Sequence, residues 1–118
     1  MASESWSSSW ANAVGLYDSL SGPAWGHIGP FREMVAALAK TDAAAGLTAA
    51  TSMHTLVVSP YTRHPDWIEG RHVLVEPLRD GNVRIESHEE GATRRPTNTW
   101  MVPVEEAQEV LERLIGQL

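Results

Sequence analysis

The chain has 118 residues, a formal net charge of -6, a hydrophobic share of 42%, five tryptophans and no cysteine. This length is typical of one domain, which we place at residues 1–118, and the apolar share excludes a disordered chain. The lack of cysteine excludes disulfides, thiolate metal sites and thiol nucleophiles, and the acidity argues against nucleic-acid binding, which needs clustered Lys and Arg.

The N-terminal stretch MASESWSSSW has neither a basic region nor an apolar run, so it does not resemble a secretory signal. No stretch of the chain is long and apolar enough to cross a bilayer. We therefore expect a cytoplasmic protein that does not contact a membrane.

The first predicted element is a helix over residues 4–20, because Trp6, Trp10 and Tyr17 lie on one stripe with helical spacing. The linker that follows, residues 21–30, holds three Gly and two Pro and is expected to be irregular.

A second helix is predicted from Pro30, which suits a first helical turn because its missing N–H costs nothing there. Phe31, Val35 and Leu38 share one face of this helix, and Glu33 is expected near the positive end of its dipole.

Residues 41–52 are small and featureless, and two alternatives remain open for them: one more short helix, or a loop. The run MHTLVVS at 53–59 is rich in β-branched residues and ends before Pro60, which predicts a strand. The polar segment 61–71 is predicted to be a connecting loop.

Asp80-Gly81, between two alternating runs, predicts a hairpin over residues 72–88. A two-residue turn would mix apolar and charged side chains on each face of the hairpin. A three-residue turn over 79–81, with Gly81 in the left-handed conformation, separates the faces. This register pairs Val75 with Ile85, Pro77 with Val83, Glu76 with Arg84, and His72 with His88 on the polar face.

The C-terminal part is predicted to hold a loop or bulge at 91–98, a strand at 99–102 and a helix after Pro103, with Glu105 and Glu106 in its first turn. Burial of the apolar stripe of this helix would contribute about 1.5–3 kcal/mol for each large side chain. The stripe consists of Ala107, Val110, Leu111, Leu114, Ile115 and Leu118.

Together these elements predict an α+β fold, in which an antiparallel sheet of about four strands has its helices packed mainly on one face as a two-layer sandwich. A monomer and a homodimer are both compatible with the sequence. Pro77 and the charged strand flanks discourage pairing through a free sheet edge.

The five histidines are the only residues that invite catalytic or metal chemistry. His54, His72 and His88, with Glu86 nearby, would form a metal site or an acid–base pair if they pointed to one face. No HExxH, nucleophile elbow or phosphate-binding glycine motif occurs, so we predict no catalytic residue, no metal and no cofactor. The paired histidines are then solvated strand residues, and His27 and His64 are surface residues.

Two tryptophans, Trp25 and Trp67, lie in irregular segments, where aromatic residues are enriched at binding interfaces. Each could equally pin its segment onto the domain. If both are partly exposed, they form the aromatic centre of a partner surface with an acidic rim. This predicted surface consists of Trp25, Asp66, Trp67, Glu69, Glu89 and Glu90.

The tail NTWMVPVEEAQEVLERLIGQL is a short aromatic strand that runs through proline into an E-E-A helix. It resembles the end of several small bacterial immunity proteins that neutralise polymorphic toxins. The resemblance covers residues 98–118 and transfers no site residue. It implies a small, acidic, cysteine-poor α+β domain without a catalytic constellation.

We therefore expect a non-enzymatic protein-binding domain, of the immunity type or otherwise regulatory, that occludes a basic partner surface such as that of a basic toxin domain. The alternative is a small enzyme or ligand-binding domain whose pocket contains His54, His72 and His88.

Overall fold

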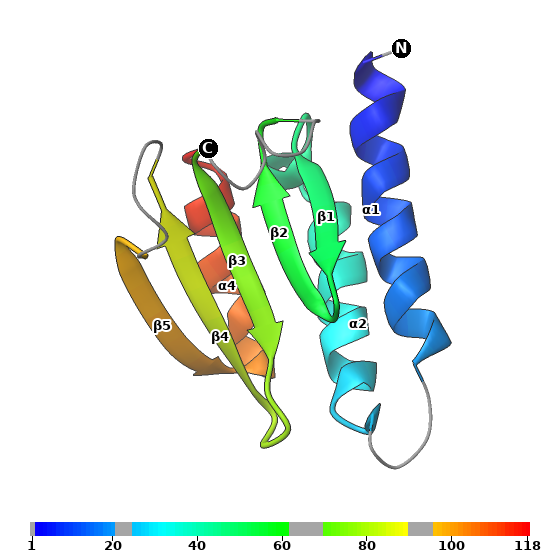
Figure 1. Cartoon of the computed structure of the whole chain (residues 1–118), viewed down its shortest axis with the longest axis vertical. Helices are drawn as coiled ribbons and strands as arrows, with labels where there is room; N and C mark the ends of the chain where they lie inside the picture. The colour runs from blue at the N-terminus through cyan, green and yellow to red at the C-terminus, as the bar shows by residue number, and fades with distance from the viewer. Residues whose placement is uncertain (1, 21–24, 62–69, 90–95) are drawn as a thin grey trace.

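The computed structural model describes residues 2–20, 25–61, 70–89 and 96–118, and only the backbone of residues 2–7 (Figure 1). The described helices are α1 (Ala2–Ser19), α2 (Ile28–Ala39), the 3-10 helix η2 (Asp42–Ala44) and α4 (Val104–Ile115). The strands are β1 (Thr48–Ser52), β2 (Thr55–Ser59), β3 (His72–Pro77), β4 (Asn82–His88) and β5 (Asn98–Pro103).

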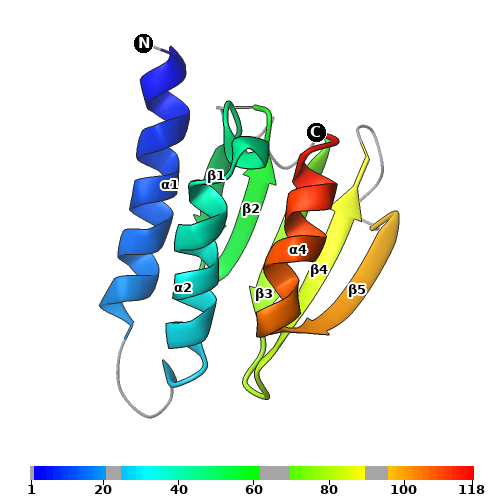
Figure 2. The ribbon, with the colours of Figure 1, turned by 180° about the vertical axis from the view of Figure 1, so that it is seen from behind.

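The five strands form one antiparallel sheet in the order β1-β2-β3-β4-β5, so each strand pairs with the next one along the chain. The α-helices lie together on one face of this sheet, as the view from behind shows (Figure 2). The predicted two-layer α+β architecture is confirmed, with five strands where about four were expected.

The hydrophobic core fills the space between the sheet and the helices, and one stripe of α4 closes it. Ala107, Leu111 and Ile115 are fully buried there, whereas Val110, Leu114 and Leu118 are half-buried at the margin. From the sheet, the core receives Leu56, Val58, Val73, Val75, Val83 and Ile85.

The first predicted helix is present as α1, and its side chains reach the sheet. Trp10 and Tyr17 are buried, as the stripe predicted. Trp10 Nε1–H donates a hydrogen bond to the Leu47 carbonyl at 3.0 Å. The stripe therefore packs on the core and also fixes the chain just before β1.

The second predicted helix, α2, begins at Ile28, so Pro30 lies in its first turn as expected. Phe31, Val35 and Leu38 are buried together, which is also as expected. The first turn holds no acidic residue, because the early start places Glu33 beyond it. The predicted contact of Glu33 with the helix dipole is therefore wrong.

Residues 41–52 contain the short helix η2, one of the two alternatives, and then a strand that was not predicted, β1. The expected strand at 53–59 starts only at Thr55, because Met53 and His54 form the turn between β1 and β2. Met53 takes the left-handed conformation in this turn, with φ 58.

The β3–β4 hairpin has the predicted three-residue turn, with Gly81 at φ 90. The predicted pairs are all present: Val75 with Ile85, Pro77 with Val83, Glu76 with Arg84, and His72 with His88. Asp80 Oδ1 accepts a hydrogen bond from the Asn82 N–H and stabilises the turn. The strand predicted at 99–102 is one residue longer at each end.

Candidate functional site

Four buried polar side chains form one row across the sheet face that no described helix covers. Thr48 pairs with Ser59, and His72 pairs with His88. The β2–β3 register, in which Val58 faces Val73, places Ser59 beside His72 and completes the row. Their exposed fractions are 8% for Thr48, 0% for Ser59, 4% for His72 and 9% for His88.

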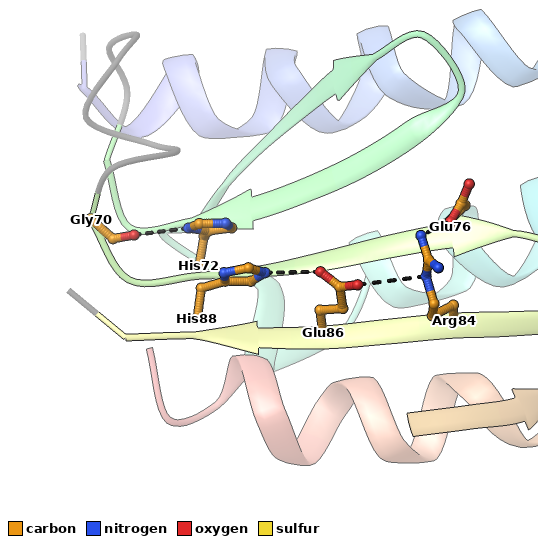
Figure 3. Close-up of polar contacts among 6 residues, drawn as sticks. All are labelled: Gly70, His72, Glu76, Arg84, Glu86 and His88. Carbon is orange, nitrogen blue, oxygen red and sulfur yellow. Dashed lines mark hydrogen bonds and ion pairs between the residues drawn. The ribbon is translucent and has the colours of Figure 1, made fainter. Parts of the chain in front are cut away.

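One end of this row is a stacked pair of imidazole rings (Figure 3). The ring centroids of His72 and His88 lie 4.4 Å apart, with an angle of 9° between the ring planes. Directly opposed positions on neighbouring strands bring two side chains this close. The predicted pairing is confirmed, but the expectation of solvated histidines is wrong, because both rings are buried.

The state of His72 is set by its backbone contact and its burial. Its Nδ1 lies 2.8 Å from the Gly70 carbonyl oxygen, which can only accept, so Nδ1 carries the proton. Burial lowers the pKa of His72 below 6.5; His88 adds to this effect, while the Gly70 bond and Glu86 oppose it. The His72 ring is therefore neutral at pH 7.

A chain of charged side chains continues from His88 along the same face (Figure 3). His88 Nε2 lies 3.0 Å from Glu86 Oε1, and Glu86 Oε2 lies 3.6 Å from Arg84 Nε. Arg84 Nη2 pairs with Glu76 Oε1 at 2.5 Å, on the opposed positions that the hairpin register predicted. The two carboxylates thus hold the guanidinium between them, and Glu86 also orients the His88 ring.

The other end of the row offers hydroxyl groups. Ser59 Oγ accepts a hydrogen bond from the Tyr61 N–H at 3.0 Å. Within the described residues, the buried Thr48 Oγ1 has no hydrogen-bond partner. A buried hydroxyl without a partner costs about 1–3 kcal/mol, so a hydrogen-bond partner for this atom would stabilise the protein.

This arrangement suits hydrogen bonding better than metal binding. Among the described residues, no three His, Asp or Glu side chains are grouped so that they could hold a metal ion. The contact between His88 Nε2 and Glu86 Oε1, at 3.0 Å, fixes the orientation of the His88 ring.

His54 does not belong to this site. It lies in the β1–β2 turn, at the opposite end of β2 from Ser59, about 16 Å away along the strand. Its ring meets the ring of Trp25 edge to face at 5.9 Å, and Trp25 also stacks on His27 at 6.2 Å. The predicted pocket containing His54, His72 and His88 is therefore not assembled.

The predicted partner surface is only partly described. Asp66, Trp67, Glu69 and Glu90 lie outside the described residues, as does His64. Trp25 is half-buried and packs against the core, and Glu89 is exposed immediately after β4. Trp25 contacts the β1–β2 turn while Glu89 adjoins His88, so these two residues lie at opposite ends of the sheet. They do not form one surface.

Two further carboxylates, Glu109 and Glu112, extend the predicted pair Glu105 and Glu106 into an acidic face on α4. Glu105, Glu106 and Glu109 are exposed and Glu112 is half-buried. None of these four carboxylates has an ion-pair partner among the described residues, whereas Asp18 pairs with Arg32. The spacing of four and three between Glu105, Glu109 and Glu112 is the signal that could have revealed this face.

In the described part of the chain, no helix has the length and apolar character needed to span a membrane. Comparison with models of protein families, with curated proteins and with solved structures found no match.

Proposed function

We propose that this chain is a non-enzymatic protein-binding domain, of the immunity or regulatory type, that covers a basic surface of its partner in the cytoplasm. The observation that supports this proposal is the acidic face of α4, defined by Glu105, Glu106, Glu109 and Glu112. A surface of one charge sign attracts a partner of the opposite sign and speeds their encounter.

Helix electrostatics explain only half of this face. Glu105 and Glu106 lie in the first turn, where the helix dipole favours carboxylates. Glu109 and Glu112 lie beyond that turn. Like charges at this spacing destabilise a helix by about 0.2–0.5 kcal/mol for each pair. A helix that keeps such carboxylates unpaired gains nothing from them within the fold, which favours a role in binding.

The test uses the product of a neighbouring gene, first of all a toxin gene directly upstream, as the candidate partner. Its affinity is measured by calorimetry for the wild-type chain and for the double variant Glu109→Gln/Glu112→Gln. We expect the double variant to bind about tenfold more weakly, equivalent to about 1.4 kcal/mol, and with a smaller dependence on salt.

The matched control is Glu33→Gln/Asp42→Asn, which removes the same charge from exposed positions outside α4. An equal loss of affinity in the control would show that only the net charge matters. The proposal would be contradicted if the chain bound no basic protein from its host but did bind a small molecule.

The row of Thr48, Ser59, His72 and His88 supports a second candidate, a small-ligand site. The supporting observation is the buried Thr48 Oγ1 without a described partner. The His72→Asn and His88→Asn variants should no longer bind a ligand at this row. Their binding of a partner through α4 should be unchanged. Metabolite screening by NMR on the three proteins separates the two candidates.

A further inference from the structure

The two edges of the sheet differ in how they are protected. The β1 edge is closed by α1, because Ser9 Oγ accepts a hydrogen bond from the Ala49 N–H at 3.0 Å and Trp10 bonds to Leu47 just before the strand. On the other side, β5 pairs only with β4, and no described element lies along its outer edge (Figure 1).

The sequence of β5 gives this open edge little protection. Its residues, NTWMVP, carry no charge, although charged residues make up 20% of the chain. Exposed edges are normally blocked by charged side chains, bulges or proline. Met101 on β5 is 57% exposed, and the only blocking residue is Pro103, at the end of the strand.

The ladder between β4 and β5 determines which backbone groups of the edge are unpaired. Val104 N–H donates to the Gly81 carbonyl at 3.1 Å. Because an antiparallel ladder alternates, the backbone groups of Val102 and Trp100 also point to β4, and those of Thr99 and Met101 point outward. Both outward residues have an N–H and a C=O to offer.

We propose that the chain forms a two-fold symmetric homodimer in which β5 pairs antiparallel with β5 of a second copy, with Trp100 at the symmetry axis. In this register Thr99 of each copy lies opposite Met101 of the other copy. The outward groups of these residues then form about four backbone hydrogen bonds, following the antiparallel pattern. Pro103, which lacks an N–H, lies outside the bonded part.

The side chains at this junction match those of the second copy. Trp100 lies on the helix-side face, is half-buried and packs against the core. At the axis it meets its counterpart in a non-hydrogen-bonded pair, the arrangement in which opposed side chains come closest. On the other face, the exposed Met101 covers Thr99 of the second copy.

A second copy is the occupant that these features favour. β5 of a second copy offers this edge an uncharged strand whose two outward backbone pairs and central Trp100 match its own. Two-fold pairing closes the assembly at two copies, since β1 is already covered by α1. The net charge of -6 on each copy opposes association, so added salt strengthens the dimer. The acidic face of α4 is not part of the junction, so this inference is independent of the proposed function.

The test measures the mass of the full chain by sedimentation equilibrium over a range of concentrations, at low and moderate salt. We expect a monomer–dimer equilibrium that shifts toward the dimer as salt is added. Met101→Lys places a charge at the junction, and Met101→Pro removes an outward N–H without breaking the ladder to β4. Each should raise the dissociation constant at least tenfold.

The matched control is Met53→Lys in the β1–β2 turn, at the other large hydrophobic side chain that is exposed in the described part of the chain. Circular dichroism confirms that each variant is folded. A wild-type chain that stays monomeric at the highest concentration and moderate salt would overturn the proposal. So would a dimer that both folded Met101 variants leave intact, or that Met53→Lys disrupts to the same extent.

Discussion

At the scale of single residues, Gly81 occupies a backbone conformation that favours glycine. Its φ of 90 lies in the left-handed region, and a Cβ added there would meet nothing within 4 Å. We therefore expect Gly81→Ala to destabilise the fold by about 1–2 kcal/mol through backbone strain alone. Urea unfolding followed by circular dichroism measures the change.

The control for this prediction is Gly15→Ala, in the interior of α1. A Cβ there also meets nothing within 4 Å, and the residue is helical. Alanine should stabilise the protein by about 0.5–1 kcal/mol, because glycine is a poor helix former. If the two substitutions changed stability in the same direction, the left-handed turn at Gly81 would be in doubt.

His72 gives the protein a pH-dependent stability. Burial lowers its pKa below 6.5, so the folded protein keeps the ring neutral under conditions in which the unfolded chain binds a proton. Its contribution to stability is complete above pH 6.5 and is lost as the pH falls toward the lowered pKa. The free energy of unfolding, measured by urea titration at several pH values, should decline below pH 6.5, and less steeply in His72→Asn.

The comparison variant is His27→Asn. Burial, Arg79 and His54 lower the pKa of His27 as well. The His27→Asn variant should therefore lose only the contribution of His27 to the decline in unfolding free energy below pH 6.5, and keep the contribution of His72. Equal slopes for the wild-type chain and His72→Asn would contradict the neutral buried ring.

The same residues show what could be predicted at this scale. The alternation around Asp80-Gly81 predicted that His72 faces His88, because the register follows from the turn length. It could not predict their burial, because whether a sheet face is covered depends on segments far away in the sequence. His54 was predicted to lie on the strand, but it lies in the turn before it. The run MHTLVVS contains both this two-residue turn and the start of β2, and its composition does not separate them.

At the scale of elements, α4 was predicted best and β1 was missed. The α4 stripe repeats at helical spacing over several turns, so its pattern is unambiguous. The β1 strand, TAATS, is built of small residues without alternation, and contacts with β2 and α1 hold it in place. Tertiary contacts decided a segment whose own preference is weak.

The α4 stripe leads to a graded prediction. Leu111 is fully buried, so Leu111→Ala should cost about 2–5 kcal/mol through lost burial and a cavity. Leu114 lies half-buried at the margin, so Leu114→Ala should cost less than about 2 kcal/mol. Urea denaturation of the two variants measures the difference. Equal costs would mean that the two faces of α4 are packed alike.

At the scale of the whole molecule, the fold class and the packing of the helices mainly on one face of the sheet could be predicted, because they follow from element order and amphipathic patterns. The candidate sites could not. The sequence does not show that the carboxylates of α4 lack ion-pair partners. This becomes clear only in the structure, where Arg32 and Arg84 pair with other carboxylates. The stacked histidines and the open edge of β5 likewise depend on the three-dimensional arrangement.

The order of the strands has a kinetic consequence. Because every strand bonds to its successor, the sheet can assemble from neighbouring segments without a long search. The α4 helix is different, since it must return from the end of the chain to contact α2. Contacts between segments far apart in the chain are slow to form, so we expect the docking of α4 on α2 to limit the refolding rate, which stopped-flow refolding measures. Substitutions that weaken the contact between α4 and α2 should therefore slow refolding. Destabilising substitutions confined to the β1–β2 turn should chiefly speed unfolding.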